Sequence, residues 1–174
     1  MLPHFLFQNP LCTATISVSI SRTGPSSRMA FCPAAMTLKE DLDVLAEALP
    51  SQIDAIFLCH GIALKADASN ALEVQKVNFL GHKYLLEKIL PRIADNGSVN
   101  IIASTGGFGW QGVFVDCAAV VNAPSYEAAL DWYETHPDVI RNGYVFSKQC
   151  LCAYVKMKVH APEYISRRIR LNAI

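Results

Sequence analysis

Apolar and polar positions follow two different periods along the chain, and from residue 37 onwards these periods alternate. Residues 38–49 place leucine and alanine at helical spacing between acidic residues, which predicts an amphipathic helix that ends at Pro50. Residues 53–59 form a short, almost wholly apolar run that stops at His60. Such a run predicts a central strand of a parallel sheet, buried on both faces.

The alternation continues to the last residue. Residues 70–93 have the apolar faces of a long helix, which Pro91 must perturb or end. Residues 98–104 predict a second buried strand, residues 144–159 another helix, and residues 168–174 the start of a third core strand. Helices alternating with strands are typical of an α/β doubly wound parallel sheet, a Rossmann-like fold, in which ligands bind outside the carboxyl ends of the strands.

Residues 1–36 lack this pattern. They contain no acidic residue and are rich in serine, threonine, proline and cysteine, although residues 11–20 alternate somewhat as a strand would. Three interpretations compete: a cleavable organelle-targeting segment, a secretory signal, and a start that is not the natural N-terminus of the protein. We favour the third, a disordered or non-native segment, and expect one domain over residues 37–174.

Composition narrows the class of partner. The formal net charge is +0 and no long run of lysine and arginine occurs, so no nucleic-acid interface is predicted. No apolar run reaches the roughly 18 residues of a membrane span. The 6 cysteines are scattered through apolar segments without the spacing of metal ligands, which favours reduced thiols in a cytoplasmic protein and no metal site.

One pair of residues suggests chemistry. Tyr144 and Lys148 lie four positions apart, which places them on one face of the predicted helix, one turn apart. An ammonium group beside a phenol favours the phenolate, and this suits the tyrosine to general acid/base work. Ser104, at the carboxyl end of a predicted strand, is placed to hold the oxygen of an alcohol or carbonyl. An ordinary amphipathic pair has the same spacing, so the surroundings must decide.

The motifs around this pair resemble those of the short-chain dehydrogenase/reductase family. Residues 59–62 resemble its Asn-Asn-Ala-Gly turn, with only the glycine matching strictly, and residues 77–81 resemble its helix motif with a catalytic asparagine. Residues 101–104 resemble its serine-bearing strand, and residues 144–148 match its Tyr-x-x-x-Lys active-site signature. Residues 170–174 resemble the strand that leads into a Pro-Gly turn. The resemblance implies a Rossmann-like fold that binds NAD or NADP.

The spacing of these motifs indicates an insertion. Ser104 and Tyr144 are 144 − 104 = 40 positions apart, more than in most members of the family. We therefore assign residues of about 105–143 to an insertion, with a predicted helix over residues 125–135. An insertion here resembles the bacterial 3α-hydroxysteroid dehydrogenase/carbonyl reductase branch. The inserted helix is expected to shape the substrate entrance or to lie in a subunit contact.

The resemblance implies a role for each matching residue. Tyr144 would donate and accept the proton, and Lys148 would favour its ionisation and hydrogen-bond the nicotinamide ribose. Ser104 would hold the substrate oxygen and stabilise charge that develops on it. Asn78 would hold a water that links Lys148 to solvent, and Gly61 would let the backbone approach the cofactor closely. The sequence does not choose between NAD and NADP.

The histidines fit this scheme poorly. The family has a small residue at the position of His60, so we interpret it as a substitution at the rim of the cofactor site. His82, His136 and His160 have no partner pattern, and we expect them at the surface.

The resemblance also shows what the matching segment lacks. The family binds pyrophosphate with a Gly-x-x-x-Gly-x-Gly turn at a helix N-terminus, but the only glycine before Gly61 is Gly24, beside a proline. The sequence ends at Ile174, before the expected Pro-Gly turn. We therefore expect a sheet that is incomplete at both ends and a chain whose own activity is impaired.

Three functions remain. The first is an NAD(P)-dependent oxidoreductase that interconverts an alcohol and a ketone, either a hydroxysteroid or a small carbonyl compound. The second is an inactive fragment that binds a full-length relative through the helices around Asn78 and Tyr144, which would also mediate a homo-oligomer. The third is an extended epimerase/dehydratase, which shares Tyr-x-x-x-Lys; the serine motif and the insertion argue against it.

Overall fold

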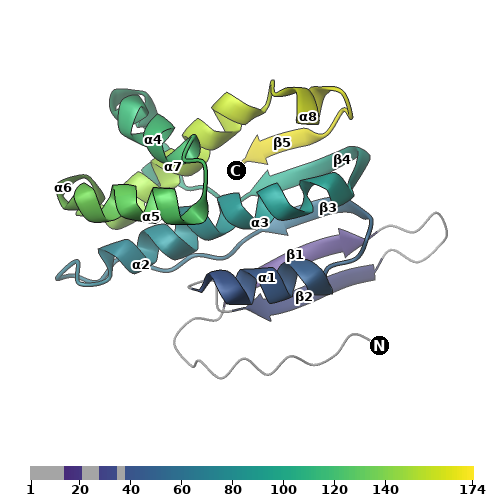
Figure 1. The fold of residues 1–174 in the computed structure, drawn as a ribbon, viewed down its shortest axis with the longest axis horizontal. Helices are drawn as coiled ribbons and strands as arrows, with labels where there is room; N and C mark the ends of the chain where they lie inside the picture. Colours follow the sequence, from purple (N-terminus) through teal and green to yellow (C-terminus); the bar gives the residue numbers. More distant parts are fainter. Residues whose placement is uncertain (1–13, 21–27, 35–37) are drawn as a thin grey trace.

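The computed structural model describes residues 14–20, 28–34 and 38–174, and its centre is a 5-stranded sheet with the order β2-β1-β3-β4-β5 (Figure 1). Strands β3 (Ile53–Leu58), β4 (Ile93–Ile101) and β5 (Arg170–Ala173) run parallel to one another. Helices connect each of these strands to the next, as the alternating pattern requires. The predicted α/β class with a parallel sheet is therefore confirmed.

The long helix predicted over residues 70–93 consists of several consecutive parts. It begins as α2 (Ala71–Gln75), passes through a π-helical turn, η1 (Lys76–Leu80), and continues as α3 (Gly81–Ile89). A 3₁₀ turn, η2 (Leu90–Arg92), then holds Pro91 near its start, so the proline ends the helix as predicted. The remaining helical elements are α1 (Lys39–Ala48), η3 (Thr105–Gly107), η4 (Trp110–Val113), α4 (Phe114–Val121), α5 (Tyr126–Thr135), α6 (Pro137–Ile140), α7 (Gly143–Lys158) and α8 (Pro162–Ile165).

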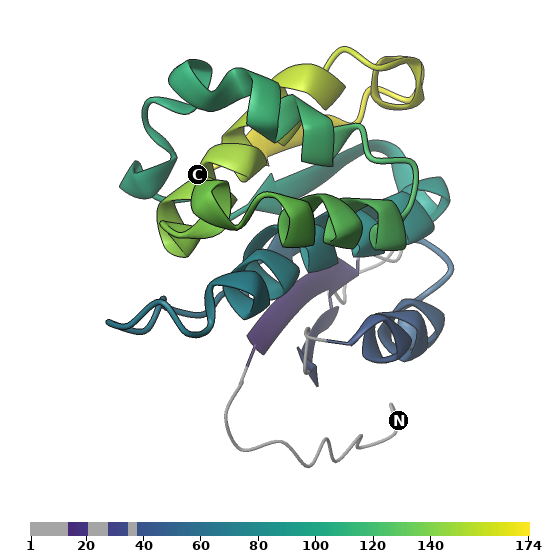
Figure 2. The ribbon, with the colours of Figure 1, turned by 60° about the vertical axis from the view of Figure 1, so that its left-hand side comes forward.

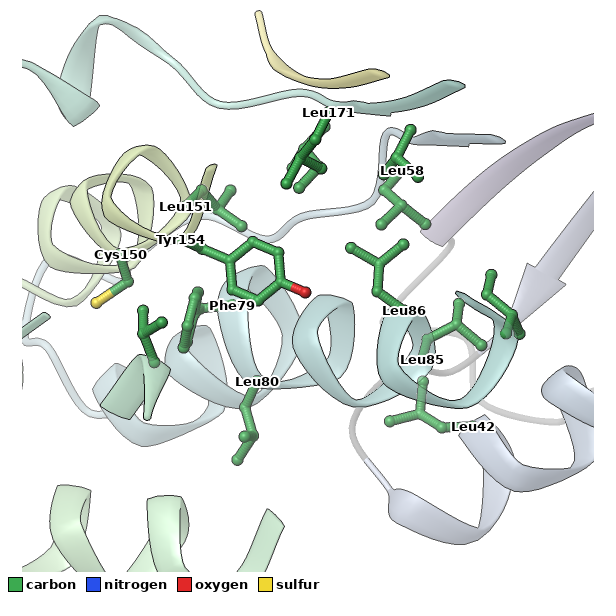
Figure 3. Close-up of a cluster of buried hydrophobic side chains, with 14 of the residues drawn as sticks. Leu42, Leu58, Phe79, Leu80, Leu85, Leu86, Cys150, Leu151, Tyr154 and Leu171 are labelled. Atoms are coloured by element: carbon green, nitrogen blue, oxygen red, sulfur yellow. The ribbon is translucent and has the colours of Figure 1, made fainter. Parts of the chain in front are cut away.

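The core lies between one face of the sheet and helices α1, α3 and α7. Leu58 and Leu171 point from the strands towards Leu86 of α3 and Tyr154 of α7 (Figure 3). Burying a leucine in this way contributes about 1.5–3 kcal/mol. Phe57 is 36% exposed because successive side chains of a strand point to opposite faces, so the prediction that β3 is buried on both faces is wrong.

Strands β1 (Ala14–Ile20) and β2 (Arg28–Ala34) form an antiparallel pair, and β1 also pairs antiparallel with β3. The register places Ile16 opposite Leu58. The carboxyl end of β1 therefore lies at the opposite edge of the sheet from the carboxyl end of β3. Of the expectation for residues 1–36, the parts at 1–13, 21–27 and 35–36 fall outside the described residues.

The predicted insertion, residues 105–143, packs against the rest of the domain, as the view in Figure 2 also shows. Cys117 of α4 lies with its Sγ 3.8 Å from Sγ of Cys150 in α7, and Tyr133 of α5 is fully buried. An ion pair between Lys39 and Glu127 joins α1 to α5. The helix predicted over residues 125–135 is confirmed as α5, whose first turn is capped by the Ser125 hydroxyl. None of the helices in the described part of the chain has the length and hydropathy of a membrane span.

The contact between η3 and α7 leaves no room for a side chain at Gly107. A Cβ there would lie 2.6 Å from Sγ of Cys152 and 3.1 Å from the carbonyl oxygen of Lys148. We expect Gly107→Ala to lower the free energy of unfolding by about 1–3 kcal/mol, because the helix must move away to admit the methyl group. Urea denaturation measures the change. Gly112→Ala is the matched control, because a Cβ at Gly112 would meet nothing within 4 Å; equal losses in the two variants would contradict the prediction.

Candidate active site

Tyr144 and Lys148 lie in the first turns of α7 and face the same spot. Nζ of Lys148 lies 5.7 Å from the centre of the Tyr144 ring. The four-residue spacing thus brings the two side chains together, as predicted for one face of a helix. Helix α7 places both side chains at the edge of the sheet at which β3 and β4 end.

Lys148 is 4% exposed, and burial lowers the pKa of its ammonium group. Nζ donates a hydrogen bond of 2.9 Å to the carbonyl oxygen of Ile102, just beyond the carboxyl end of β4. No carboxylate among the described residues forms a salt bridge with it. An ammonium group has three N–H donors, so Lys148 retains donors for a bound molecule.

Asn78 lies in the π-helical turn η1 and holds the loop that follows β3. Its Oδ1 accepts a hydrogen bond of 2.8 Å from the Ile62 amide, and its Nδ2 donates one of 3.0 Å to the Ile62 carbonyl. Nδ2 also lies 3.3 Å from the Ser147 hydroxyl, which in turn donates to the Tyr144 carbonyl at 2.7 Å. The Asn78 side chain thereby links the loop after β3 to α7.

Gly61 lies where this loop comes closest to Asn78 and Lys148. A Cβ at Gly61 would lie 3.3 Å from Oδ1 of Asn78 and 3.7 Å from Nζ of Lys148. The absence of a side chain lets the backbone lie directly against both groups. Gly61 is thus beside Lys148.

Ser104 caps the 3₁₀ turn η3. Its Oγ accepts a hydrogen bond of 3.1 Å from the Gly106 amide. A Cβ at Gly106 would lie 3.6 Å from this Oγ and 3.5 Å from Cε1 of Tyr144, so the serine hydroxyl and the tyrosine ring flank the same glycine. Because Oγ accepts from the backbone, its own O–H remains free to donate.

Two histidines lie deeper than the sequence indicates. His60 is 2% exposed rather than at a rim, and His82 is fully buried, so the prediction of a surface position for His82 is wrong. The two rings stack, with centroids 3.6 Å apart and an angle of 12° between their planes. The missed signal is the four-residue spacing from Asn78, which puts His82 on the same buried helix face. His136 and His160 are exposed, as predicted.

Gln75 is a site residue that the sequence pattern did not reveal. Its side chain is fully buried in α2, and Nε2 donates a hydrogen bond of 2.6 Å to the carbonyl oxygen of Gly143. Gly143 packs against Ala71, which a Cβ at the glycine would approach to 3.3 Å. Helix α2 therefore holds the start of α7 immediately before Tyr144. A polar residue on the apolar face, three positions before Asn78, was the available signal.

Comparison with known proteins agrees with this geometry. The coniferyl-alcohol dehydrogenase of Pseudomonas sp. (strain HR199 / DSM 7063) is 28% identical over 159 residues, which cover 90% of this chain and 60% of the relative. The crystal structure of the 3-alpha-hydroxysteroid dehydrogenase from Pseudomonas sp. B-0831, complexed with NADH, matches with a TM-score of 0.63 and 19% identity, over 81% of this chain and 56% of that one. No model of a known protein family matches. The predicted resemblance to the short-chain dehydrogenases/reductases is thus accompanied by sequence similarity to one dehydrogenase and by the fold of another.

The chain spans about three fifths of the length of these two relatives. The residues to which the resemblance assigns roles lie close to one another at this edge of the sheet: Tyr144, Lys148, Ser104, Asn78 and Gly61. The pyrophosphate half of the cofactor fits less well. No glycine-rich turn occurs among the described residues, and β1 ends at the opposite edge of the sheet.

Proposed function

We propose that the chain carries the proton-transfer site of an NAD(P)-dependent oxidoreductase that interconverts an alcohol and a ketone. One observation carries the proposal: Tyr144, Lys148 and Ser104 surround one spot at the carboxyl ends of β3 and β4. The Ser104 hydroxyl and the Tyr144 ring flank Gly106, and Lys148 lies 5.7 Å from the centre of that ring. Ligands bind at this edge in doubly wound folds.

The proposed roles combine the resemblance with the positions of the side chains. The bound nicotinamide ring would supply the hydride chemistry. Tyr144 accepts the hydroxyl proton of the alcohol, and the Lys148 ammonium group stabilises the phenolate. Ser104 uses its free O–H to donate to the substrate oxygen, which holds that oxygen beside Tyr144. In the reduction, Tyr144 returns the proton and the same contacts hold the ketone.

The substrate class follows from the resemblance and from the surface beside the site. A hydroxysteroid or a small carbonyl compound is our first choice, and the curated relative adds coniferyl alcohol to the compounds worth testing. Phe108, which directly follows the turn at Ser104, is 79% exposed and offers an apolar contact for such compounds. NADH is the reduced cofactor to try first, since the structural neighbour was crystallised with it.

The proposal predicts alcohol-dependent formation of the reduced nicotinamide. The purified chain would be mixed with NAD⁺ or NADP⁺ and with a hydroxysteroid, a small secondary alcohol or coniferyl alcohol, and the absorbance of the reduced cofactor followed. Oxidation of at least one alcohol is the expected result. Tight binding of NADH without turnover of any of these alcohols would contradict the proposal, because the cofactor would then be in place and the chemistry absent.

An inactive chain that acts only as the partner of a full-length relative is the second candidate. The direction of β1 and the absence of a glycine-rich turn among the described residues favour it, because the pyrophosphate would lack its usual partners. Calorimetric titration with NADH and NADPH separates the two candidates. Affinity in the micromolar range would overturn the second candidate, and the absence of measurable binding would support it.

A further inference from the structure

The stacked histidines lie next to the candidate active site, and their ring nitrogens are poorly hydrogen-bonded. The backbone of Val77 acts on the His60 ring, and the backbones of Asn78 and Leu58 act on the His82 ring. Among the described residues, however, none forms a hydrogen bond of ordinary geometry with Nδ1 or Nε2 of either ring. A buried donor or acceptor without a partner costs about 1–3 kcal/mol. Two imidazoles with such poor hydrogen bonds are therefore more costly to bury than two apolar side chains of the same size.

The position of the pair suggests what offsets this cost. The loop after β3 and the helix η1–α3 are joined at two levels. At one level, Ile62 is hydrogen-bonded to Asn78 through both its amide and its carbonyl group. At the other level, His60 stacks on His82. His60 precedes Ile62 by two residues and His82 follows Asn78 by four, so the two contacts join the same two segments in parallel.

Gly61 lies between these two levels. A Cβ added at Gly61 would lie 3.7 Å from Nζ of Lys148. Even a small movement of the loop would therefore change the distance between the Gly61 backbone and this ammonium group. Burial lowers the pKa of His60 to about 3 and that of His82 well below its ordinary value, and the charge of Lys148 acts on both rings in the same direction. Because burial disfavours the protonated form of both rings, the stack adds no favourable place for a second positive charge near the Lys148 ammonium group.

We propose that the His60–His82 stack is a positioning element of the candidate active site, which fixes the loop at residues 60–62 on the helix and thereby holds Asn78 and the backbone of Gly61 against Lys148. The importance of this arrangement rests on the proposed function, which gives Lys148 its role. The stack itself can be tested without turnover. A failure of the stack to position Lys148 is therefore distinguishable from a failure of the oxidoreductase proposal.

Hydrogen exchange of the Ile62 amide tests the first part, because this N–H donates to Asn78. We expect His60→Ala to accelerate its exchange at least about tenfold more than that of the Val99 amide in β4, since only the local contact is lost. His60→Phe restores a ring that can stack, and should return the exchange towards that of the unchanged chain. Leu42→Ala, a buried truncation in α1, is the matched control for general destabilisation and should accelerate both amides alike.

The titration of Lys148 tests the second part. Burial lowers the pKa of this lysine, so the water that enters when the stack is lost should raise it towards the ordinary value. NMR of the Lys148 side chain would follow the change in His60→Ala, with Leu42→Ala expected to leave the titration unaltered. A merely structural role for the histidines does not predict a shift confined to the His60 variant.

Unchanged relative exchange at Ile62 in His60→Ala, or the same changes in Leu42→Ala, would overturn the proposal. Should His60→Ala fail to fold, His82→Ala carries the same expectations. Should both variants fail to fold, hydrogen exchange of the unchanged chain is the test. The free energy of opening at the Ile62 amide should then equal that at the Val99 amide. A lower free energy of opening at Ile62 would overturn the proposal.

Discussion

Replacing Tyr144 with phenylalanine is expected to lower the rate of alcohol oxidation by at least about 100-fold while leaving the fold intact. The ring would still fill its place beside Gly106 and Lys148, but the group that accepts the substrate proton would be gone. Among the described residues, none is hydrogen-bonded to the Tyr144 hydroxyl, so its removal leaves no buried partner unsatisfied. The loss should therefore fall on the reaction and not on stability.

The measurement is the turnover rate with saturating cofactor and alcohol, accompanied by a urea denaturation curve for each variant. Tyr126→Phe is the matched control, since Tyr126 lies in α5 and contacts Tyr84 instead of the site. The control should keep the turnover of the unchanged chain. Turnover that survives Tyr144→Phe would mean that the proton passes through another group, and the proposed mechanism would be wrong.

Acid should destabilise the fold between about pH 6.5 and pH 5, where most carboxylates remain ionised. In the unfolded chain a histidine takes up a proton near pH 6.5, whereas burial and the charge of Lys148 lower the pKa of His60 to about 3 in the folded chain. The unfolded state therefore binds more protons, and the free energy of unfolding falls as the pH falls. For His60 alone the loss is about 2 kcal/mol at pH 5. His82, with its pKa also lowered by burial, adds a loss in the same direction.

Urea denaturation at a series of pH values measures this effect. The double variant His60→Phe/His82→Phe should lose most of the pH dependence over the interval, because neither ring can be protonated in the unfolded chain. His160→Gln is the control, since His160 is exposed, and it should keep the dependence. An unchanged slope in the double variant would show that other groups cause the acid sensitivity.

The local patterns of apolar and polar residues predicted much of the fold, because they determine the order of the strands and helices. Strands β3 and β5 lie within the predicted runs, whereas β4 begins at residue 93, before the predicted start at residue 98. Helix α7 begins one residue before its predicted start. The direction of β1 could not be read in the same way, since pairing with β3 is a contact between distant segments and alternation does not fix its direction. The exposure of Phe57 was missed because a short apolar run does not show which faces helices will cover.

Part of the candidate site was likewise predictable from the sequence, and part was not. The Tyr144–Lys148 contact follows from helical spacing, and the proximity of Ser104 follows from the rule that parallel strands end at one edge. The burial of His82 and the hydrogen bond from Gln75 to Gly143 depend on which helix face meets which loop. These contacts are products of packing in three dimensions, and a single sequence gives only an indirect indication of them.

The π-helical turn η1 has a consequence for how this segment can change in evolution. A π-helical turn contains one residue more than an α-helical turn, and each residue of an α-helix turns the chain by about 100°. Deleting Phe79 or Leu80 would therefore turn this segment into an α-helical one and change the angle around the helix between Asn78 and His82. Substitutions can alter this site gradually. A change of length in η1 would instead alter the relative position of the Ile62–Asn78 and His60–His82 contacts in a single step.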